Sequence, residues 1–276
     1  HEVPAGVDAY EDAVSWTPFR SVKHAREAGA ALAELHLAAA DYDAPVRRPR
    51  PLVASFSIFA GENPAEAMEN YFAARPALHA DAATRRRCEE AMELLRPFHE
   101  DLRLLLPALK PLWTHNDLHA SNLFWSDAGE QARATAVIDF GLADRTNAVY
   151  DLAQAIERNL VEWLTLVNDP AHPERVRVHF NQLHGLLEGY EQVRTLSCEE
   201  RAALAPMAAL CHVEFALTET DYFLGALHSP EKASVASDGY LLGHARWFRG
   251  VGTKLLDEIR RWADRREKPL NGDLRG

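Results

Sequence analysis

The sequence has few cysteines and no long apolar run. Only three of its 276 residues are cysteine, widely spaced and without a C-x-x-C pair. A small, odd number of scattered cysteines indicates neither a disulfide framework nor a zinc site, so we interpret them as buried thiols. No apolar stretch approaches the ~18 residues that a membrane-spanning helix needs, and the residues after His1 lack the charged-then-apolar pattern of a signal peptide. We therefore expect a soluble, cytoplasmic protein without a membrane partner.

Negative charge outnumbers positive charge. The sequence has 30 Lys and Arg against 41 Asp and Glu, which gives a formal net charge of −11. Because phosphate backbones attract basic surfaces, this balance argues against nucleic acid as a partner, whereas a cationic small molecule would be welcome. The 13 histidines include no H-E-x-x-H or comparable pair of metal ligands. The hydrophobic content of 47% is ample for the core of a folded globular protein.

One stretch carries the candidate chemistry. It contains H-N-D-L-H-A-S-N at residues 115–122, in which four residues separate Asp117 from Asn122, and D-F-G at residues 139–141. This is the order and spacing of the kinase catalytic loop H-R-D-x-x-x-x-N and of the metal-binding D-F-G. Phosphoryl transfer from ATP needs a carboxylate that orients the attacking hydroxyl and hard oxygen ligands for Mg²⁺. Asp117 is therefore the predicted catalytic base, and Asn122 and Asp139 are the predicted ligands of Mg²⁺ and ATP.

Each of these residues also has an ordinary structural interpretation. An aspartate near a glycine is usually a turn or cap residue, and an isolated asparagine indicates nothing. Three matches in the right order favour the catalytic interpretation. For the two histidines of the loop the structural interpretation stays ahead. His115, beside the predicted base, and His119 are expected to brace the loop through hydrogen bonds.

The motif set resembles that of the aminoglycoside phosphotransferase and choline kinase family, the small-molecule branch of the protein-kinase-like fold. That family carries H-G-D-x-H-x-x-N, then I-D-F or I-D-W, and then Y-D-L-A; here the corresponding residues read H-N-D-L-H-A-S-N, V-I-D-F-G and Y-D-L-A. Asn116 stands where the family usually has Gly, which affects only a spacer position. The resemblance implies the same base and metal ligands. It also implies that Asp151 opens a helix as its N-cap and holds the catalytic loop through backbone N–H groups.

The resemblance further implies a second lobe, of which the sequence shows no sign. Related kinases have an upstream β-lobe with a nucleotide loop and a lysine for the phosphates. Here there is no G-x-G-x-x-G, and the first lysine, Lys23, lies in a predicted helix. We expect residues 1–20 to connect two lobes and residues 21–276 to form the helical C-terminal lobe, with an N-terminal lobe from the same gene. Whether that lobe was removed, is disordered or never existed is left open.

The expected fold class is α+β, mainly α, with a small β-hairpin at the active site. Two strands, residues 123–125 and 135–138, are predicted on either side of a polar turn, and their antiparallel pairing would bring Asn122 beside Asp139. A Pro-rich loop is expected at residues 45–51. Apolar spacing predicts helices over residues 21–40, 64–80, 84–106, 148–167, 174–193, 198–227 and 238–266, with the third kinked or split at Pro97.

An ATP-dependent phosphotransferase acting on a small-molecule hydroxyl is the leading hypothesis. A protein substrate is disfavoured because Gly141 and Asp151 are only ten positions apart, which leaves no room for a long activation segment. The resemblance implies an aminoglycoside or another antibiotic, a choline-like alcohol or a sugar as acceptor, and ATP or GTP as donor. Its acceptor pocket often contains acidic residues; the candidates here are Glu157, Glu214, Glu219 and Asp221, most of them interpreted as exposed helix charges. The alternative is a catalytically silent kinase-like module that binds a ligand or partner.

Overall fold

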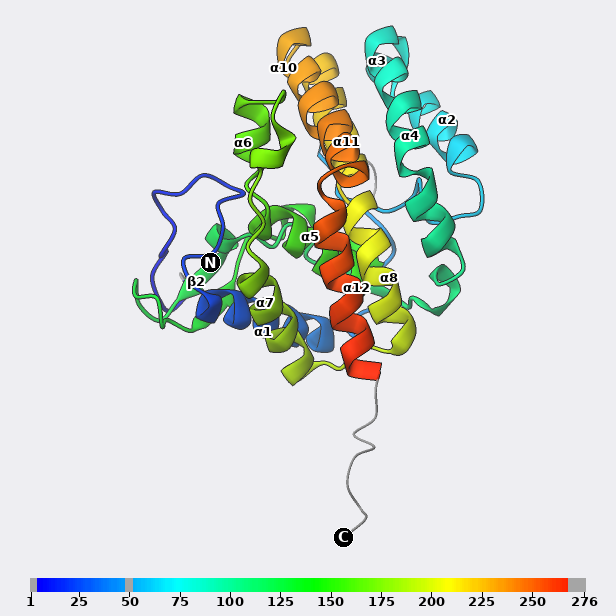
Figure 1. Cartoon of the computed structure of the whole chain (residues 1–276). Coiled ribbons are helices and arrows are strands. Elements are labelled where there is room, and N and C mark those ends of the chain that lie inside the picture. Colours follow the sequence, from blue (N-terminus) through cyan, green and yellow to red (C-terminus); the bar gives the residue numbers. More distant parts are fainter. Residues whose placement is uncertain (1–3, 48–51, 268–276) are drawn as a thin grey trace.

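The computed structural model describes residues 4–47 and 52–267 as a mainly helical protein with four short strands (Figure 1). Part of the predicted Pro-rich loop, residues 48–51, and the predicted lobe's last residues, 268–276, lie outside this description. The predicted fold class is confirmed. The helices are α1 (Val22–Ala38), α2 (Pro64–Ala73), α3 (Pro76–Ala80), α4 (Ala82–Arg103), α5 (Ala148–Leu160), α6 (Trp163–Asn168), α7 (Phe180–Val193), α8 (Cys198–Leu210), α9 (Val213–Asp221), α10 (Pro230–Ser234), α11 (Gly243–Arg249) and α12 (Thr253–Glu267).

The strands form two separate antiparallel ribbons. They are β1 (Pro111–Thr114), β2 (Leu123–Trp125), β3 (Ala134–Val137) and β4 (Asp144–Asn147), with β2 paired to β3 and β1 to β4. In the first ribbon Leu123 lies opposite Val137, and the Ile138 N–H donates to the Asn122 carbonyl at 2.9 Å. The predicted hairpin is therefore present. Its pairing places Asn122 next to the residue that precedes Asp139.

The second ribbon was not expected from the sequence. Strand β4 has no alternation of apolar and polar residues, yet Thr114 of β1 and Thr146 of β4 are buried between the strands with their hydroxyl oxygens 2.6 Å apart. Because β1 leads into the residues 115–122 and β4 leads into α5, the pairing starts the predicted catalytic loop and α5 side by side. The ribbon thus positions the loop against the helix.

Helices α1 and α7 pack with almost no side chain between them. A Cβ at Gly189 of α7 would lie 1.9 Å from the Arg26 carbonyl oxygen of α1, and the α7 backbone leaves as little room at Gly29. Only glycine allows backbones to approach this closely. The contact brings the buried His36 of α1 to the hydroxyl of Tyr190 of α7, at 2.7 Å. Helix α8, buried along its second half, contacts α4, α5 and α12 at the centre of the helical core.

The helix predictions were right in location and wrong in continuity. Helix α4 runs through Pro97 without interruption, because buried side chains on both sides of the proline, Leu95 and Phe98 among them, anchor the helix in the core. The long segments predicted after residue 148 are broken into shorter helices, the first where Val161 leaves α5 to bridge Val178. No helix within the described ranges has the length and apolar character needed to cross a membrane.

Candidate active site

Asp117 lies on a loop whose backbone turns sharply just before it. Asn116 has a φ of 63°, in the left-handed region that asparagine tolerates better than most residues other than glycine. This explains why asparagine can occupy a position where the resembled family usually has Gly. The ring of His115 accepts the Asp117 N–H at Nδ1, 3.2 Å away, and its Nε2 lies 2.7 Å from the Ile138 carbonyl oxygen. His115 therefore ties the loop to the end of β3 by hydrogen bonds.

The two predicted metal ligands are brought to neighbouring backbone positions by the β2–β3 ribbon. The Asn122 amide nitrogen donates to the Asp117 carbonyl at 2.9 Å and lies 3.1 Å from His119 Nε2, which leaves the amide oxygen for a cation. Asp139 has a φ of 57° and is exposed, and its carboxylate accepts only the Gly141 N–H, at 3.1 Å, among the hydrogen bonds of the described chain. One amide oxygen and one carboxylate are hard ligands that suit Mg²⁺ when phosphate and water supply the rest. Within the described ranges no group of three or more His, Cys, Asp or Glu is arranged to hold a metal by itself.

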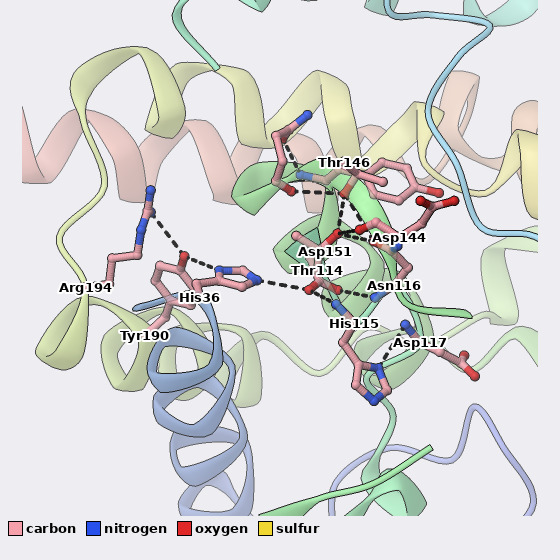
Figure 2. Close-up of polar contacts among 12 residues, drawn as sticks. His36, Thr114, His115, Asn116, Asp117, Asp144, Thr146, Asp151, Tyr190 and Arg194 are labelled. Atoms are coloured by element: carbon pink, nitrogen blue, oxygen red, sulfur yellow. Dashed lines mark hydrogen bonds and ion pairs between the residues drawn. The ribbon is translucent and has the colours of Figure 1, made fainter. Parts of the chain in front are cut away.

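Asp151 stands behind the loop, fully buried in α5 (Figure 2). Its carboxylate accepts the N–H groups of His115 and Asn116 at 2.7 and 2.8 Å, and His36 Nε2 lies 3.0 Å away. The predicted N-cap position was wrong: the cap of α5 is Asn147, and Asp151 lies one turn inside the helix. Burial raises the pKa of Asp151, but the hydrogen bond and charge of His36, the charge of His115 and the hydrogen bond from Asn116 together lower it more, so the pKa lies below its ordinary value.

The contacts behind the loop continue outward in a line that Figure 2 shows. His36 Nδ1 lies 2.7 Å from the Tyr190 hydroxyl, which accepts from Arg194 at 3.1 Å. Arg194 in turn forms an ion pair with Glu200 at 2.6 Å. We call the set Asp151, His36, Tyr190 and Arg194 the brace. It connects the backbone of the candidate catalytic loop to α1, α5 and the end of α7.

In front of the loop, Asp117 is paired with Arg158, a residue that the motif analysis missed. Arg158 Nη1 lies 2.7 Å from Asp117 Oδ1, and the guanidinium carbon lies 4.6 Å from the centre of the Phe215 ring. Burial lowers the pKa of Arg158, but nearby negative charge, that of Asp117 first, raises it above its ordinary value. Arg158 follows Asp151 by seven positions, so both project from one face of α5. This seven-residue spacing was the one signal in the sequence that could have indicated Arg158.

His119 is the second histidine of the loop. Its Nε2 lies 3.8 Å from Asp117 Oδ2, and its Nδ1 lies 2.8 Å from the Ser121 hydroxyl. Burial lowers the pKa of His119, partly offset by the negative charge of Asp117, so the ring is neutral near neutral pH. A neutral ring held by Ser121 and Asn122 is placed for hydrogen bonding within the loop.

The four acidic candidates fall into two groups. Glu214 is buried and accepts hydrogen bonds from the segment 55–58, including the Ile58 N–H at 2.6 Å, so it holds that segment instead of facing Asp117. Asp221 is oriented toward α3, where burial raises its pKa while Arg75 and a backbone hydrogen bond from Leu78 lower it. Glu214 thus has hydrogen-bond partners in the segment 55–58, and Asp221 lies near Arg75 and Leu78. Their assignment as substrate contacts stays a prediction.

Glu157 and Glu219 both lie near Arg158, and Glu219 also lies near Asp117. Glu157 is 1% exposed, with Oε1 2.9 Å from His244 Nδ1, so it is not one of the exposed helix charges that most of the four candidates were expected to be. Burial raises the pKa of Glu157 to about 7, although Arg158 lowers it. Glu219, on α9, is partly exposed. Burial raises its pKa to about 7 as well, with Arg158 lowering it and Asp117 raising it.

A helical lobe that presents an H-x-D-x-x-x-x-N loop beside a D-F-G turn defines a phosphotransferase of the protein-kinase-like fold. The model of the phosphotransferase enzyme family matches residues 9–196, and the chain belongs to that family. The resemblance seen in the motifs is thereby confirmed.

The chain is also similar to individual proteins. It is 31% identical over 223 residues to a homoserine kinase of Rhodospirillum rubrum, a match that covers 78% of this chain and 57% of the relative. The chain therefore spans less than two thirds of that relative's length. The structure of a microcompartment-associated aminopropanol kinase matches with a TM-score of 0.51 at 19% identity, covering 92% of this chain and 68% of the other, a similarity of fold alone. An aminoglycoside phosphotransferase from Alicyclobacillus acidocaldarius matches at 16% identity with a TM-score of 0.42, over 96% and 71% of the two chains.

Proposed function

We propose that the protein transfers the γ-phosphoryl group of ATP to a hydroxyl of a small molecule, with Mg²⁺ as cofactor; GTP is an alternative donor. The observation that carries the proposal is the meeting of three groups. Asp117 and Asn122 lie on one loop, and the hydrogen bond between Ile138 and Asn122 brings the start of the D-F-G turn beside that loop. The proposal is supported by the family to which the chain belongs.

Each residue has a proposed role. Asn122 and Asp139 would hold Mg²⁺, which when bound neutralises charge on the phosphate oxygens. Asp117 would accept or align the proton of the acceptor hydroxyl. His115 would keep Asp117 in place, since its ring accepts the Asp117 N–H and contacts the end of β3. Positioning of this kind supplies much of the catalysis of phosphoryl transfer, because little covalent chemistry falls to the protein.

The acceptor belongs to the proposal and includes the classes expected from the motifs. These are aminoglycosides and other antibiotics, choline-like alcohols and sugars. The homoserine kinase relative adds homoserine, a small hydroxy amino acid, to the acceptors worth testing. Glu219, which lies near Asp117 and Arg158, and Glu157, which precedes Arg158 on α5, are the acidic residues best placed for contact with it.

We also propose that residues 21–276 act as the C-terminal lobe of a two-lobed enzyme, joined through residues 1–20 to a nucleotide-binding lobe. The sequence shown has no Gly-rich phosphate loop, which is the part that would cover ATP. Residues 1–276 alone should therefore bind Mg·ATP weakly in a calorimetric titration. Tight binding by this fragment would contradict the two-lobed proposal.

The function is tested by a mass-spectrometric search for phosphorylated product. The full-length protein would be incubated with Mg·ATP and a panel of aminoglycosides, macrolides, choline-like alcohols, sugars, homoserine and aminopropanol. The control variants are Asp117→Asn, which removes the predicted base but keeps an oxygen for Arg158, and Asp127→Asn in the exposed β2–β3 turn. A product that disappears only with Asp117→Asn supports the proposal. Absence of any product and of ATP hydrolysis would contradict it and favour a catalytically silent ligand-binding module.

A further inference from the structure

Arg158, the ion-pair partner of Asp117, lies among buried polar atoms that make no hydrogen bond. Within residues 4–47 and 52–267, Arg158 Nε and Nη2, the Tyr240 hydroxyl and Glu157 Oε2 make no hydrogen bond, whereas Glu157 Oε1 lies 2.9 Å from His244 Nδ1. Arg158 is 2% exposed, Tyr240 is 6% exposed and Glu157 is 1% exposed. Buried polar atoms are nearly always paired in native proteins, and an unpaired one costs about 1–3 kcal/mol or more. Several at one place indicate that a bound molecule completes the group.

The guanidinium of Arg158 is held in a fixed orientation. Arg158 is bound at Nη1 to Asp117 and stacks on the ring of Phe215, so its two free nitrogens present a defined edge. A planar guanidinium edge of this kind matches the two oxygens of a carboxylate. The Tyr240 hydroxyl belongs to a π-helical turn, residues 235–242, and such turns are frequent at functional sites.

An acidic side chain stands at the edge of this group. Glu219 on α9 is partly exposed, and we find no hydrogen bond or ion pair to its carboxylate among the residues that the structure describes. The charged groups acting on it are Arg158, Asp117 and Glu157. Arg158 already neutralises the charge of Asp117. The carboxylate of Glu219 is therefore suited to bind an ammonium group from solution.

We infer that Arg158 and Glu219 recognise the two charged groups of the acceptor, its carboxylate and its ammonium, and that the acceptor is a short hydroxy amino acid with its hydroxyl at Asp117. The inference rests on the proposed function and narrows it to one substrate class. In such an acceptor the carboxylate would pair with the free donors of Arg158, and the ammonium would pair with the carboxylate of Glu219.

The other acceptor classes leave part of this group unpaired. An amino alcohol without a carboxylate, or a polycationic aminoglycoside, would pair with Glu219 but leave the buried N–H groups of Arg158 unmet. A hydroxy acid without an ammonium would meet Arg158 and place its charge near Glu219 and Glu157. A sugar offers only neutral hydroxyls, whose hydrogen bonds are roughly half as strong as charge-assisted ones.

Three acceptors that share the same three-carbon unit between the hydroxyl and the charged groups separate these cases. Homoserine carries both charges, 3-aminopropanol lacks the carboxylate, and 4-hydroxybutyrate lacks the ammonium. With the full-length protein and Mg·ATP we expect kcat/KM for homoserine to exceed that for each analogue by at least about 100-fold, because a buried charge left unpaired is strongly rejected. An equal or higher kcat/KM for 3-aminopropanol would overturn the inference while leaving the proposed function intact. No phosphorylation of any acceptor, including the wider panel, would instead count against the proposed function.

Variants of Arg158 and Glu219 test which charged group of the acceptor each residue binds. Arg158→Met should remove the preference for homoserine over 3-aminopropanol, reducing the ratio of their kcat/KM values to within about tenfold. Glu219→Gln should raise KM for homoserine and 3-aminopropanol and leave unchanged or lower that for 4-hydroxybutyrate, whose carboxylate no longer meets a like charge there. Its partly exposed position makes it the safer variant for folding. Arg246→Met, at an exposed ion pair with Glu90, is the matched control and should change none of these ratios. Equal losses for all three acceptors in both site variants would overturn the inference, since they would indicate a structural role.

Discussion

Helix α5 presents two charged residues to the same loop, and the two differ in how completely the protein pairs them. Behind the loop, the Asp151 carboxylate accepts two backbone N–H groups and contacts His36, and the line continues to Tyr190 and Arg194 (Figure 2). In front, Arg158 contacts Asp117 and keeps two buried nitrogens unpaired. The members of the brace pair with one another, whereas the front of the loop keeps buried guanidinium nitrogens that we propose a ligand would pair.

The difference distinguishes residues that hold the loop in place from residues that we propose for binding and catalysis. A buried charge with all its hydrogen bonds made contributes rigidity, and one with bonds missing costs stability. Proteins retain such a cost where binding or catalysis repays it. Substitutions behind the loop should therefore act on folding, and substitutions in front should act on turnover or even increase stability.

Replacing Asp117 in front of the loop should have the largest effect, and it should be on rate alone. Asp117→Asn removes the base and keeps an oxygen for Arg158, so we expect turnover to fall by about 10²–10⁴-fold with little change in the free energy of unfolding. Steady-state kinetics of the full-length protein and chemical denaturation measure the two quantities. Turnover within tenfold of wild type would remove Asp117 from the role of base.

Asp139 provides the second test of the front of the loop. Asp139→Ala should abolish the Mg²⁺-dependent part of nucleotide binding, because it removes one of two predicted oxygen ligands from an exposed turn without changing the core. Calorimetry with and without Mg²⁺ measures this. Asp127→Ala in the neighbouring β2–β3 turn is the matched control. Unchanged Mg²⁺ dependence in Asp139→Ala would exclude the metal role.

Behind the loop the largest change should be in stability. Asp151→Ala leaves the N–H groups of His115 and Asn116 without an acceptor and should lower the free energy of unfolding by about 3–5 kcal/mol. Urea denaturation measures the loss. Asp101→Ala, at an exposed aspartate 3.7 Å from Arg260, should change stability by no more than about 0.5 kcal/mol. A loss no larger than that of the control would show that the brace does not hold the loop.

The free energy of unfolding should depend on pH through the buried carboxyl of Glu157. Burial raises its pKa from 4.5 to about 7, so the folded state binds this proton more tightly than the unfolded state. Its contribution to stability is therefore present below about pH 4.5 and is lost as pH rises through about 7, a change on the order of 3 kcal/mol. His212 and His244, whose pKa values burial lowers, act in the opposite direction below their ordinary pKa.

The comparison of Glu157→Gln with wild type isolates this contribution. The variant cannot ionise, so its stability relative to wild type should increase between pH 5 and pH 8 by an amount on the order of 3 kcal/mol. Glu34→Gln, on the exposed face of α1, is the control and should follow wild type at every pH. A constant difference between Glu157→Gln and wild type across this range would show that Glu157 does not titrate there.

The sequence allowed the chemistry of the loop to be predicted because short-range spacing encodes it. The H-N-D-L-H-A-S-N stretch and the hairpin between Asn122 and Asp139 are local features, and each could be recognised from residue order alone. Most helices were located from apolar periodicity for the same reason. Their breaks were not, because a break such as that at Val161 depends on a pairing with Val178 further along the chain.

The partners of buried charges could not be predicted, since they depend on the packing of distant segments. Glu214 bonds to residues 55–58, more than 150 positions earlier, and so its carboxylate is used for folding. Arg158 meets Asp117 only because β1 pairs with β4, a strand whose polar sequence gives no signal of its own. Pro97 was expected to kink or split the helix; α4 is not split there, because tertiary packing outweighed the local preference.

The most direct measurement follows the terminal phosphate itself. The full-length protein would be given Mg·ATP labelled with ¹⁸O in the γ-phosphate together with homoserine and the wider acceptor panel, and the products would be weighed by mass spectrometry. We predict a phosphorylated acceptor that carries the label of the γ-phosphate, formed together with ADP and strongly reduced in Asp117→Asn. ADP formed without a labelled acceptor, or no ADP at all, would contradict the assignment of this loop as a phosphoryl-transfer site.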